Sequence, residues 1–230
     1  MVTFNINHQP RLYAGLCAVG KCSVLADIGT DHGFVSVYAV TNGIASRAIA
    51  TDISKKSLDK AITLVEQMSL EDKIECRVGD GLMPIKENEA DVLFIAGMGG
   101  DLILEILKKS PAVCSKASKI VMIPMQNTPK LRAGLWRLSL KITAQSLVRE
   151  NGRIYEVITA TPGADEEYTL AEELLGREST YKGDPLFEEY VSLRLEKTNQ
   201  LLSLVPEDAY ERTEELKAHK EIFESALRSI

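Results

Sequence analysis

The chain has 230 residues, a length that accommodates one large domain or one domain with an appendage. Its composition, with 45% hydrophobic and 26% charged residues, is that of a globular protein rather than of a disordered or fibrous one. No apolar run approaches the roughly 20 residues that a membrane-spanning helix needs, so we expect no membrane partner.

The formal net charge of −6 is unevenly distributed. Residues 1–163 carry 19 Lys or Arg and 16 Asp or Glu, whereas residues 164–230 carry 8 and 17. This asymmetry predicts two domains with different roles, residues 1–163 and residues 164–230. Because the basic residues are concentrated in the first part, the acidic total does not exclude a nucleic acid as partner.

The four cysteines are scattered along the chain, and none belongs to a C-x-x-C pair. We therefore expect no metal site and no redox motif. Buried, reduced thiols fit this pattern and predict a cytoplasmic protein.

The first predicted elements surround the stretch VLADIGTDHG at residues 24–33. We expect a short helix over residues 10–20, a strand that ends at Asp27, a tight turn through Gly29 and Gly33, and a helix over residues 35–42. Glycine has no Cβ, so this turn allows the backbone to approach a ligand closely.

Strands and helices then alternate along the chain. The predicted segments are a strand at 46–53, a helix at 55–68, strands at 73–80 and 91–96, a break at 97–100, a helix from 102 and a strand at 119–123. Five strands alternating with helices predict a parallel sheet that is covered on both faces.

Residues 142–161 depart from this alternation. Two strand-like runs flank Asn151 and Gly152, a strong signal for a β-hairpin. An antiparallel hairpin after a five-stranded parallel sheet is unlike a plain nicotinamide-binding fold and resembles the seven-stranded sheet of class I methyltransferases. The remaining chain predicts helices at 166–177, 185–204 and 207–229, the last two forming an antiparallel hairpin.

Acidic residues stand at three successive predicted strand ends. Asp27 ends the first strand, Asp52 the second and Asp80 the third, where Gly81 follows. Any one of them is explained as a cap or turn residue, but repetition at the carboxyl edge of the sheet favours a ligand site. Asp52 lies 23 residues after Gly29, the spacing of an acid that binds ribose hydroxyls.

The glycine loop discriminates between nucleoside cofactors. A nicotinamide dinucleotide site requires G-x-G-x-x-G, whereas this chain has D-x-G-x-D-x-G. Asp31 would direct a negative charge toward the pyrophosphate of a dinucleotide. The carboxylate better suits a ligand with a cationic centre, such as the sulfonium of S-adenosylmethionine.

Together with VLADIGTDHG, the motifs GDGL at 79–82, IAGMGG at 95–100 and Asn127 resemble the TrmK family of bacterial tRNA adenine-N1 methyltransferases. The resemblance covers essentially the whole chain. It implies an α/β class I (Rossmann-like) methyltransferase domain with a seven-stranded, mostly parallel sheet, and a C-terminal α-helical antiparallel coiled-coil hairpin. It also implies S-adenosyl-L-methionine as cofactor, tRNA as partner and N1 of adenine 22 as the methylated atom. We expect a monomer, with a weak dimer as the alternative.

The resemblance also assigns roles to individual residues. It implies that Arg11 lies at the mouth of the site. We expect catalytic roles for Arg11, for Asp31, which would stabilise positive charge on the methylated ring, and for Asn127, which would fix the base edge. His32 would be a general base or a hydrogen-bond partner of the loop or of the cofactor. The implied cofactor-binding residues are Asp27, Gly29, Thr30, Asp31, His32, Gly33, Asp52, Ile53, Asp80, Gly81, Ala96, Gly97, Met98 and Gly99.

The chain departs from the family where Pro124, Met125 and Gln126 precede Asn127, since the family tends to have Leu-Gln-Pro-Asn. Basic residues near the site should contact phosphates. The candidates are Arg11, Lys21, Lys130, Arg132, Arg137 and Arg153.

Three alternatives remain open from the sequence. The first is a class I methyltransferase that acts on a different RNA, a protein or a small molecule, with the same cofactor residues. The second is a non-catalytic RNA-binding protein with this fold. The third, an NAD-dependent oxidoreductase, is disfavoured by Asp31 and by the hairpin at 142–161.

Overall fold

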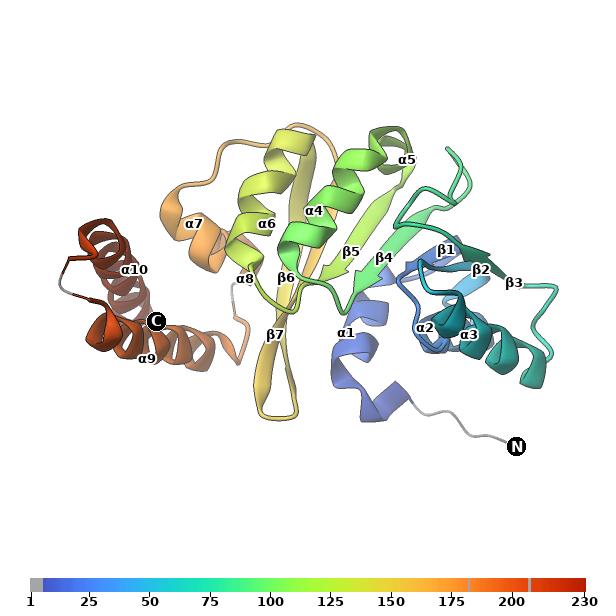
Figure 1. Cartoon of the computed structure of the whole chain (residues 1–230), viewed down its shortest axis with the longest axis horizontal. Coiled ribbons are helices and arrows are strands. Elements are labelled where there is room, and N and C mark those ends of the chain that lie inside the picture. The colour runs from blue at the N-terminus through green and yellow to red at the C-terminus, as the bar shows by residue number, and fades with distance from the viewer. Residues whose placement is uncertain (1–5, 182, 207) are drawn as a thin grey trace.

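The structure, a computed structural model, describes residues 6–181, 183–206 and 208–230. Its centre is one seven-stranded sheet with the strand order β3-β2-β1-β4-β5-β7-β6 (Figure 1). The strands are β1 (Cys22–Ile28), β2 (Ala45–Asp52), β3 (Ile74–Val78), β4 (Val92–Ala96), β5 (Lys119–Ile123), β6 (Leu140–Glu150) and β7 (Arg153–Pro162).

Strand pairing confirms the predicted mixed sheet. β1 pairs in parallel with β2 and β4, and β3 and β5 extend the parallel part on either side. β7 runs antiparallel to both β5 and β6. The turn between β6 and β7 has positive φ at Asn151 (50°) and Gly152 (74°), as a tight hairpin turn requires.

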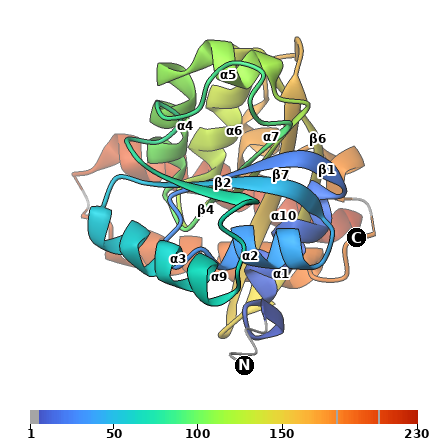
Figure 2. The same cartoon turned by 90° about the vertical axis from the view of Figure 1, so that its right-hand side faces the viewer.

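Helices cover both faces of the sheet, as Figures 1 and 2 show. α1, α2 and α3 lie on one face, and α4, α5 and α6 on the other. Their bounds are α1 (Pro10–Val19), α2 (Phe34–Thr41), α3 (Lys55–Gln67), α4 (Gly100–Lys109), α5 (Pro111–Lys116) and α6 (Thr128–Leu135), with 3-10 turns η1 (Ile6–His8) and η2 (Trp136–Leu138).

The pattern of β4 explains why the central strands read as continuous apolar runs. Leu93 and Ile95 pack in the core under α4 and α6, whereas Val92 and Phe94 pack in the core under α1 and α2. Successive side chains of a strand point to opposite faces, so a strand buried on both sides must be apolar throughout.

Among the residues that the structure describes after β7 there are four helices, α7 (Leu170–Leu175), α8 (Glu178–Tyr181), α9 (Phe187–Leu204) and α10 (Tyr210–Ser229). The single helix expected at 166–177 is wrong in extent. Thr169 and Glu172 form a capping box that starts α7, and Gly176 with φ of 81° ends it. The predicted helices at 185–204 and 207–229 correspond to α9 and α10, and the start expected at residue 207 lies outside the described residues.

α9 and α10 pack against each other as a helical hairpin beyond β6 and β7 (Figure 1). Tyr190 and Val191 of α9 and Phe223 of α10 form a third apolar cluster with Leu147 of β6 and Leu175 of α7. The third apolar cluster therefore packs residues 164–230 against residues 1–163. The division of the chain into these two domains stays a prediction.

Within the described residues, each helix is too short or too polar to span a lipid bilayer. Over the same residues, no group of three or more His, Cys, Asp or Glu side chains has the arrangement of a metal site.

Candidate functional site

The turn that follows β1 is fixed to the end of β2. The backbone amides of Gly29 and Thr30 donate to the carbonyl oxygen of Thr51, over 2.8 and 2.9 Å. Gly29 has φ of 76°, and a Cβ there would lie 2.1 Å from the Met98 methyl carbon. The positive φ therefore favours glycine at this point, and a Cβ would displace the Met98 side chain where the loops after β1 and β4 meet.

A cavity of about 500 Å³ lies at this carboxyl edge of the sheet, where open α/β folds bind ligands. It brings together ten of the residues that the sequence singled out. They are Arg11, Asp27, Gly29, Thr30, Asp31, His32, Asp52, Ala96, Gly97 and Met98. Gln9, Leu12, Phe34, Val35 and Phe94 complete the lining. These five were missed because they belong to apolar or capping positions that carry no ligand signal.

Asp27 is the buried acid of the cavity, with 4% of its surface exposed. Burial raises the pKa of its carboxyl group to about 6, although the Ser36 hydroxyl donates to Oδ2 over 3.0 Å. An anionic Asp27 is therefore costly without a partner, and a cationic or hydrogen-bond-donating ligand would compensate it.

Asp31 lies at the exposed side of the cavity. Its Oδ1 accepts a hydrogen bond from Lys60 Nζ at 2.9 Å, and its Oδ2 lies 2.8 Å from His32 Nδ1. The bond from Lys60 is the main cause that lowers the pKa of Asp31, so the group is an anion at neutral pH. The His32 ring stacks on Phe34 with 5.0 Å between ring centres.

The other two acids differ in position. Asp52 ends β2 as expected, and its Oδ1 accepts from the Ser54 amide over 2.7 Å. β3 ends at Val78, so the expectation that Asp80 ends the third strand is wrong. Asp80 pairs with Lys109 at 3.0 Å and does not line the cavity.

Four further residues expected at the cofactor also lie outside the cavity lining. Gly33 caps α2 where an added Cβ would lie 3.0 Å from the Cβ of Ala61 in α3, and a Cβ at Gly81 would lie 2.8 Å from Ile106. Gly99 precedes α4, and Ile53 follows β2 with 71% of its surface exposed. Their contact with a cofactor stays a prediction.

Residues 124–127, here called the 124–127 loop, connect β5 to α6. The Met125 amide donates to the Met98 carbonyl, and the Gly100 amide donates to the Gln126 carbonyl, both over 2.8 Å. Asn127 occupies the left-handed region with φ of 58°, and its Nδ2 donates to Asp101 Oδ2 over 2.5 Å. Asn127 thus stands beside the cavity rather than in its lining.

Arg11 of α1 connects the cavity to its surroundings. Its guanidinium lies 5.3 Å from the centre of the Tyr155 ring, and its Nη1 lies 2.6 Å from Met125 Sδ. Its Nε is 3.4 Å from Glu150 Oε1. Arg11 therefore stands between the cavity and the groove described next.

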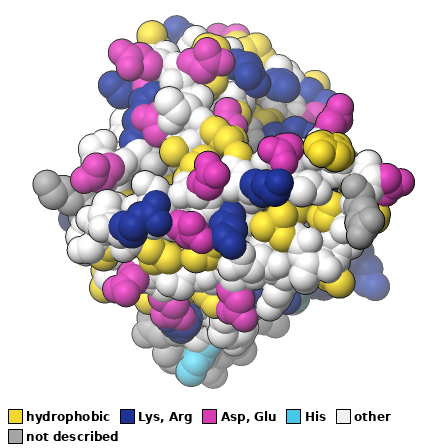
Figure 3. Space-filling view, turned by 90° about the vertical axis from the view of Figure 1, so that its left-hand side faces the viewer, with side chains coloured by type: hydrophobic (Ala, Val, Ile, Leu, Met, Phe, Trp, Pro, Cys, Tyr) yellow, Lys and Arg dark blue, Asp and Glu magenta, His cyan; other side chains and the backbone are white. Residues whose placement is uncertain are grey.

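A second hollow of about 640 Å³ lies between the 124–127 loop and the hairpin α9–α10. We call it the basic groove, because Arg153, Arg194, Lys197 and Arg212 line it. Three of these four residues belong to residues 164–230. Because this part of the chain has a net negative charge, the sequence did not indicate a cationic surface there. Figure 3 views the molecule from this end and shows Lys and Arg side chains interspersed with acidic ones.

One expected phosphate contact is wrong. Arg132 has no exposed surface, because it forms an ion pair with Glu156 inside the protein. Arg153 does line the basic groove. The sequence alone does not distinguish a buried arginine from an exposed one, because burial of the charge depends on an acidic partner from another element.

The arrangement suits a nucleoside with a positive centre. Acids stand at the ends of β1 and β2, the chain at Gly97 leaves open space, and Asp31 supplies an exposed negative charge. A cationic groove adjoins this cavity at Arg11. Such a site can hold a cationic cofactor while a polyanion occupies the groove.

Comparisons with known proteins agree with this geometry. A methyltransferase-domain family model matches residues 8–158. The tRNA (adenine(22)-N(1))-methyltransferase of Bacillus subtilis is 37% identical over 141 residues, 61% of this chain. That alignment spans 59% of the relative's own length, less than two thirds of it.

Solved structures match over nearly the whole chain. The B. subtilis m1A22 tRNA methyltransferase TrmK superimposes with a TM-score of 0.84 at 29% identity, covering 94% of this chain and 97% of that one. The Streptococcus pneumoniae protein Sp1610 in complex with S-adenosyl-L-methionine gives 0.85 at 26% identity, covering 94% and 98%. The fold class and the resemblance expected from the motifs are confirmed, and the chain belongs to the methyltransferase-domain family as a homologue of the B. subtilis enzyme.

Proposed function

We propose that this protein uses S-adenosyl-L-methionine to methylate N1 of adenine 22 in tRNA. The observation that carries the proposal is the acidic cavity next to the basic groove, in a chain homologous to an enzyme with this activity. The cavity suits a cationic nucleoside, and the groove suits a phosphate backbone.

The residues of the cavity fit this cofactor. Asp52 at the end of β2 would accept hydrogen bonds from the ribose hydroxyls, as acids at this position do in nucleotide-binding folds. Asp27 and the turn at Gly29 would surround the rest of the nucleoside. S-adenosyl-L-methionine, when bound, supplies an electrophilic methyl group to a nitrogen nucleophile.

The protein's own part in the reaction is positioning and charge stabilisation. N1 of adenine has a free lone pair, so the site need not remove a proton before attack. Asp31, held anionic by Lys60, would stabilise the positive charge that develops on the ring. Asn127 would hold the base edge, and His32 would orient Asp31 through their contact.

The groove gives the RNA a route to the cavity. N1 lies on the Watson–Crick edge, so a paired adenine must leave its stack before it reacts. With the backbone on Arg153, Arg194 and Lys197, the extruded base would pass Arg11 toward the cavity. In this scheme residues 1–163 bind the cofactor and residues 164–230 form the far wall of the groove.

The test is to incubate the purified protein with labelled S-adenosyl-L-methionine and bulk tRNA, digest the product and identify the labelled nucleoside. We expect 1-methyladenosine, absent when adenine 22 is replaced by guanine. Label on another nucleoside, or only on protein or small molecules, would contradict the proposal. Cofactor-free RNA binding without any transfer would favour a non-catalytic role.

A further inference from the structure

The buried pair Arg132–Glu156 lies where the sheet meets the C-terminal helices. Arg132 belongs to α6 and Glu156 to β7, and neither side chain is more than 4% exposed. Arg132 also donates from Nε to Gln145 Oε1 of β6 over 2.8 Å. The pair therefore joins three elements of the methyltransferase domain directly.

The same pair reaches three C-terminal helices. Arg132 Nη1 donates to the carbonyl of Glu173 in α7 over 2.8 Å, and Nη2 donates to the Tyr181 hydroxyl of α8 over 2.9 Å. Glu156 accepts from the hydroxyls of Tyr181 (2.5 Å) and of Tyr190 in α9 (2.8 Å). Each charge is thus surrounded by directional hydrogen bonds.

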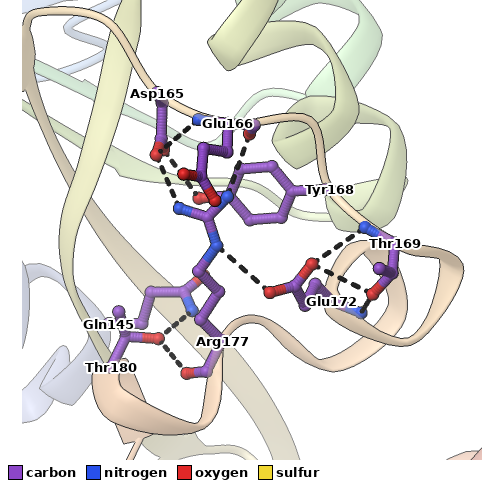
Figure 4. A network of polar contacts seen from close by, with 8 residues as sticks. All are labelled: Gln145, Asp165, Glu166, Tyr168, Thr169, Glu172, Arg177 and Thr180. Atoms are coloured by element: carbon purple, nitrogen blue, oxygen red, sulfur yellow. Dashed lines mark hydrogen bonds and ion pairs between the residues drawn. The ribbon is translucent and has the colours of Figure 1, made fainter.

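A second cluster fixes the connection between β7 and α8 (Figure 4). Arg177 donates to Asp165 over 2.6 Å and to the Glu166 carbonyl over 2.9 Å, and its guanidinium lies 4.1 Å from the centre of the Tyr168 ring. Gln145 Nε2 donates to the Thr180 hydroxyl over 2.7 Å. Gln145 therefore contributes to both clusters and couples them.

α6 continues from the pair to the candidate site. Its first residue, Thr128, follows the 124–127 loop directly, and the Leu131 amide donates to the Asn127 carbonyl over 3.2 Å. Arg132 is the next residue along this helix. The loop on one wall of the basic groove and Tyr190 on the other are thus connected through Arg132 and Glu156.

Stability alone does not account for this arrangement. Removing two charges from water costs several kcal/mol per ion, and buried pairs are often replaceable by apolar side chains without loss. A buried ion pair does add a constraint on orientation, because each of its directional hydrogen bonds fixes the relative geometry of two elements. Here the elements so fixed are the two walls of one groove.

We propose that Arg132 and Glu156 are positioning residues that hold the hairpin α9–α10 at a fixed distance from the 124–127 loop and so preorganise the basic groove for RNA. The proposal rests on the proposed function in that RNA is the ligand of the groove. A preformed groove avoids the entropy loss of ordering its walls when the RNA binds.

The test compares Tyr190→Phe with wild type and with Tyr210→Phe, a matched control on α10 whose side chain is 77% exposed. Tyr190→Phe removes the hydroxyl that joins α9 to Glu156 while it keeps the aromatic ring in the apolar cluster. We measure kcat and KM for tRNA, the affinity for S-adenosyl-L-methionine by calorimetry, and amide hydrogen exchange of residues 125–128, 130 and 131 in the RNA-free protein.

For Tyr190→Phe we expect KM for tRNA to rise about tenfold, as lost preorganisation predicts, with kcat and cofactor affinity each within about twofold of wild type. Amides of the 124–127 loop should exchange faster. Loss of folded protein would instead lower kcat without raising KM. A rise in KM at nearly constant kcat therefore distinguishes a positioning role from a purely structural one.

A KM within about twofold of wild type, or an equal loss in Tyr210→Phe, would overturn the proposal. If the wild-type protein methylates no tRNA, the proposed function fails. The hydrogen-exchange measurement then tests by itself whether Tyr190 and the 124–127 loop are coupled. Faster exchange of the 124–127 loop would then support the connection through Arg132, and unchanged exchange would refute it.

Discussion

Asp27 should make the unbound protein less stable as the pH rises. Its folded-state pKa is raised to about 6 by burial, from 3.8 when unperturbed. The folded state therefore holds the proton more tightly than the unfolded state. Below about pH 3 the group is neutral in both states, whereas above about pH 6 the folded state carries a buried anion.

The magnitude follows from the shift. About two pKa units correspond to about 3 kcal/mol of destabilisation, which develops between about pH 4 and pH 6 and stays constant above. Asp27→Asn removes the charge with little change in shape. Relative to wild type, its free energy of unfolding should increase by about 2 kcal/mol more at pH 8 than at pH 4, because the unfolded-state carboxyl is already partly ionised at pH 4.

The assay is urea denaturation without cofactor at both pH values. Comparing the two conditions cancels any constant effect of the new amide. Asp72→Asn, at an exposed acid, is the control and should show no such difference. A difference between wild type and Asp27→Asn that is the same at pH 4 and pH 8 would refute the assignment of a buried, costly carboxylate.

Asp31→Ala should lower methyl transfer by about 100-fold or more while the melting temperature changes little, since its exposed ion pair contributes little to stability; wild-type turnover would remove Asp31 from the mechanism. Gly29→Ala should lose cofactor affinity in calorimetry, because its Cβ would lie 2.1 Å from the Met98 methyl carbon and would displace that side chain, which lines the cavity. Gly43→Ala, with similar φ but no atom within 4 Å, should retain affinity, and equal losses would argue against a close approach at Gly29. The double variant Arg194→Gln/Lys197→Gln should weaken tRNA binding and reduce the slope of log affinity against log salt by about 1 to 2, whereas an unchanged slope would exclude phosphate contacts in the groove.

Local sequence determined the sheet and the acidic edge. Apolar runs, capping residues and the Asn151–Gly152 turn act over a few residues, so they predicted the strands and the β6–β7 hairpin. Parallel strands place their carboxyl ends at one edge, which brought Asp27, Asp31 and Asp52 together as expected.

Tertiary structure decided what lies around that edge. Arg132 reads as a surface cation in the sequence, but its partners Gln145, Glu156 and Tyr181 lie 13 to 49 residues further along the chain. The basic groove likewise combines Arg153 with side chains of α9 and α10 from the acidic part. Burial and charge clustering depend on which distant elements meet, and no local pattern encodes that meeting.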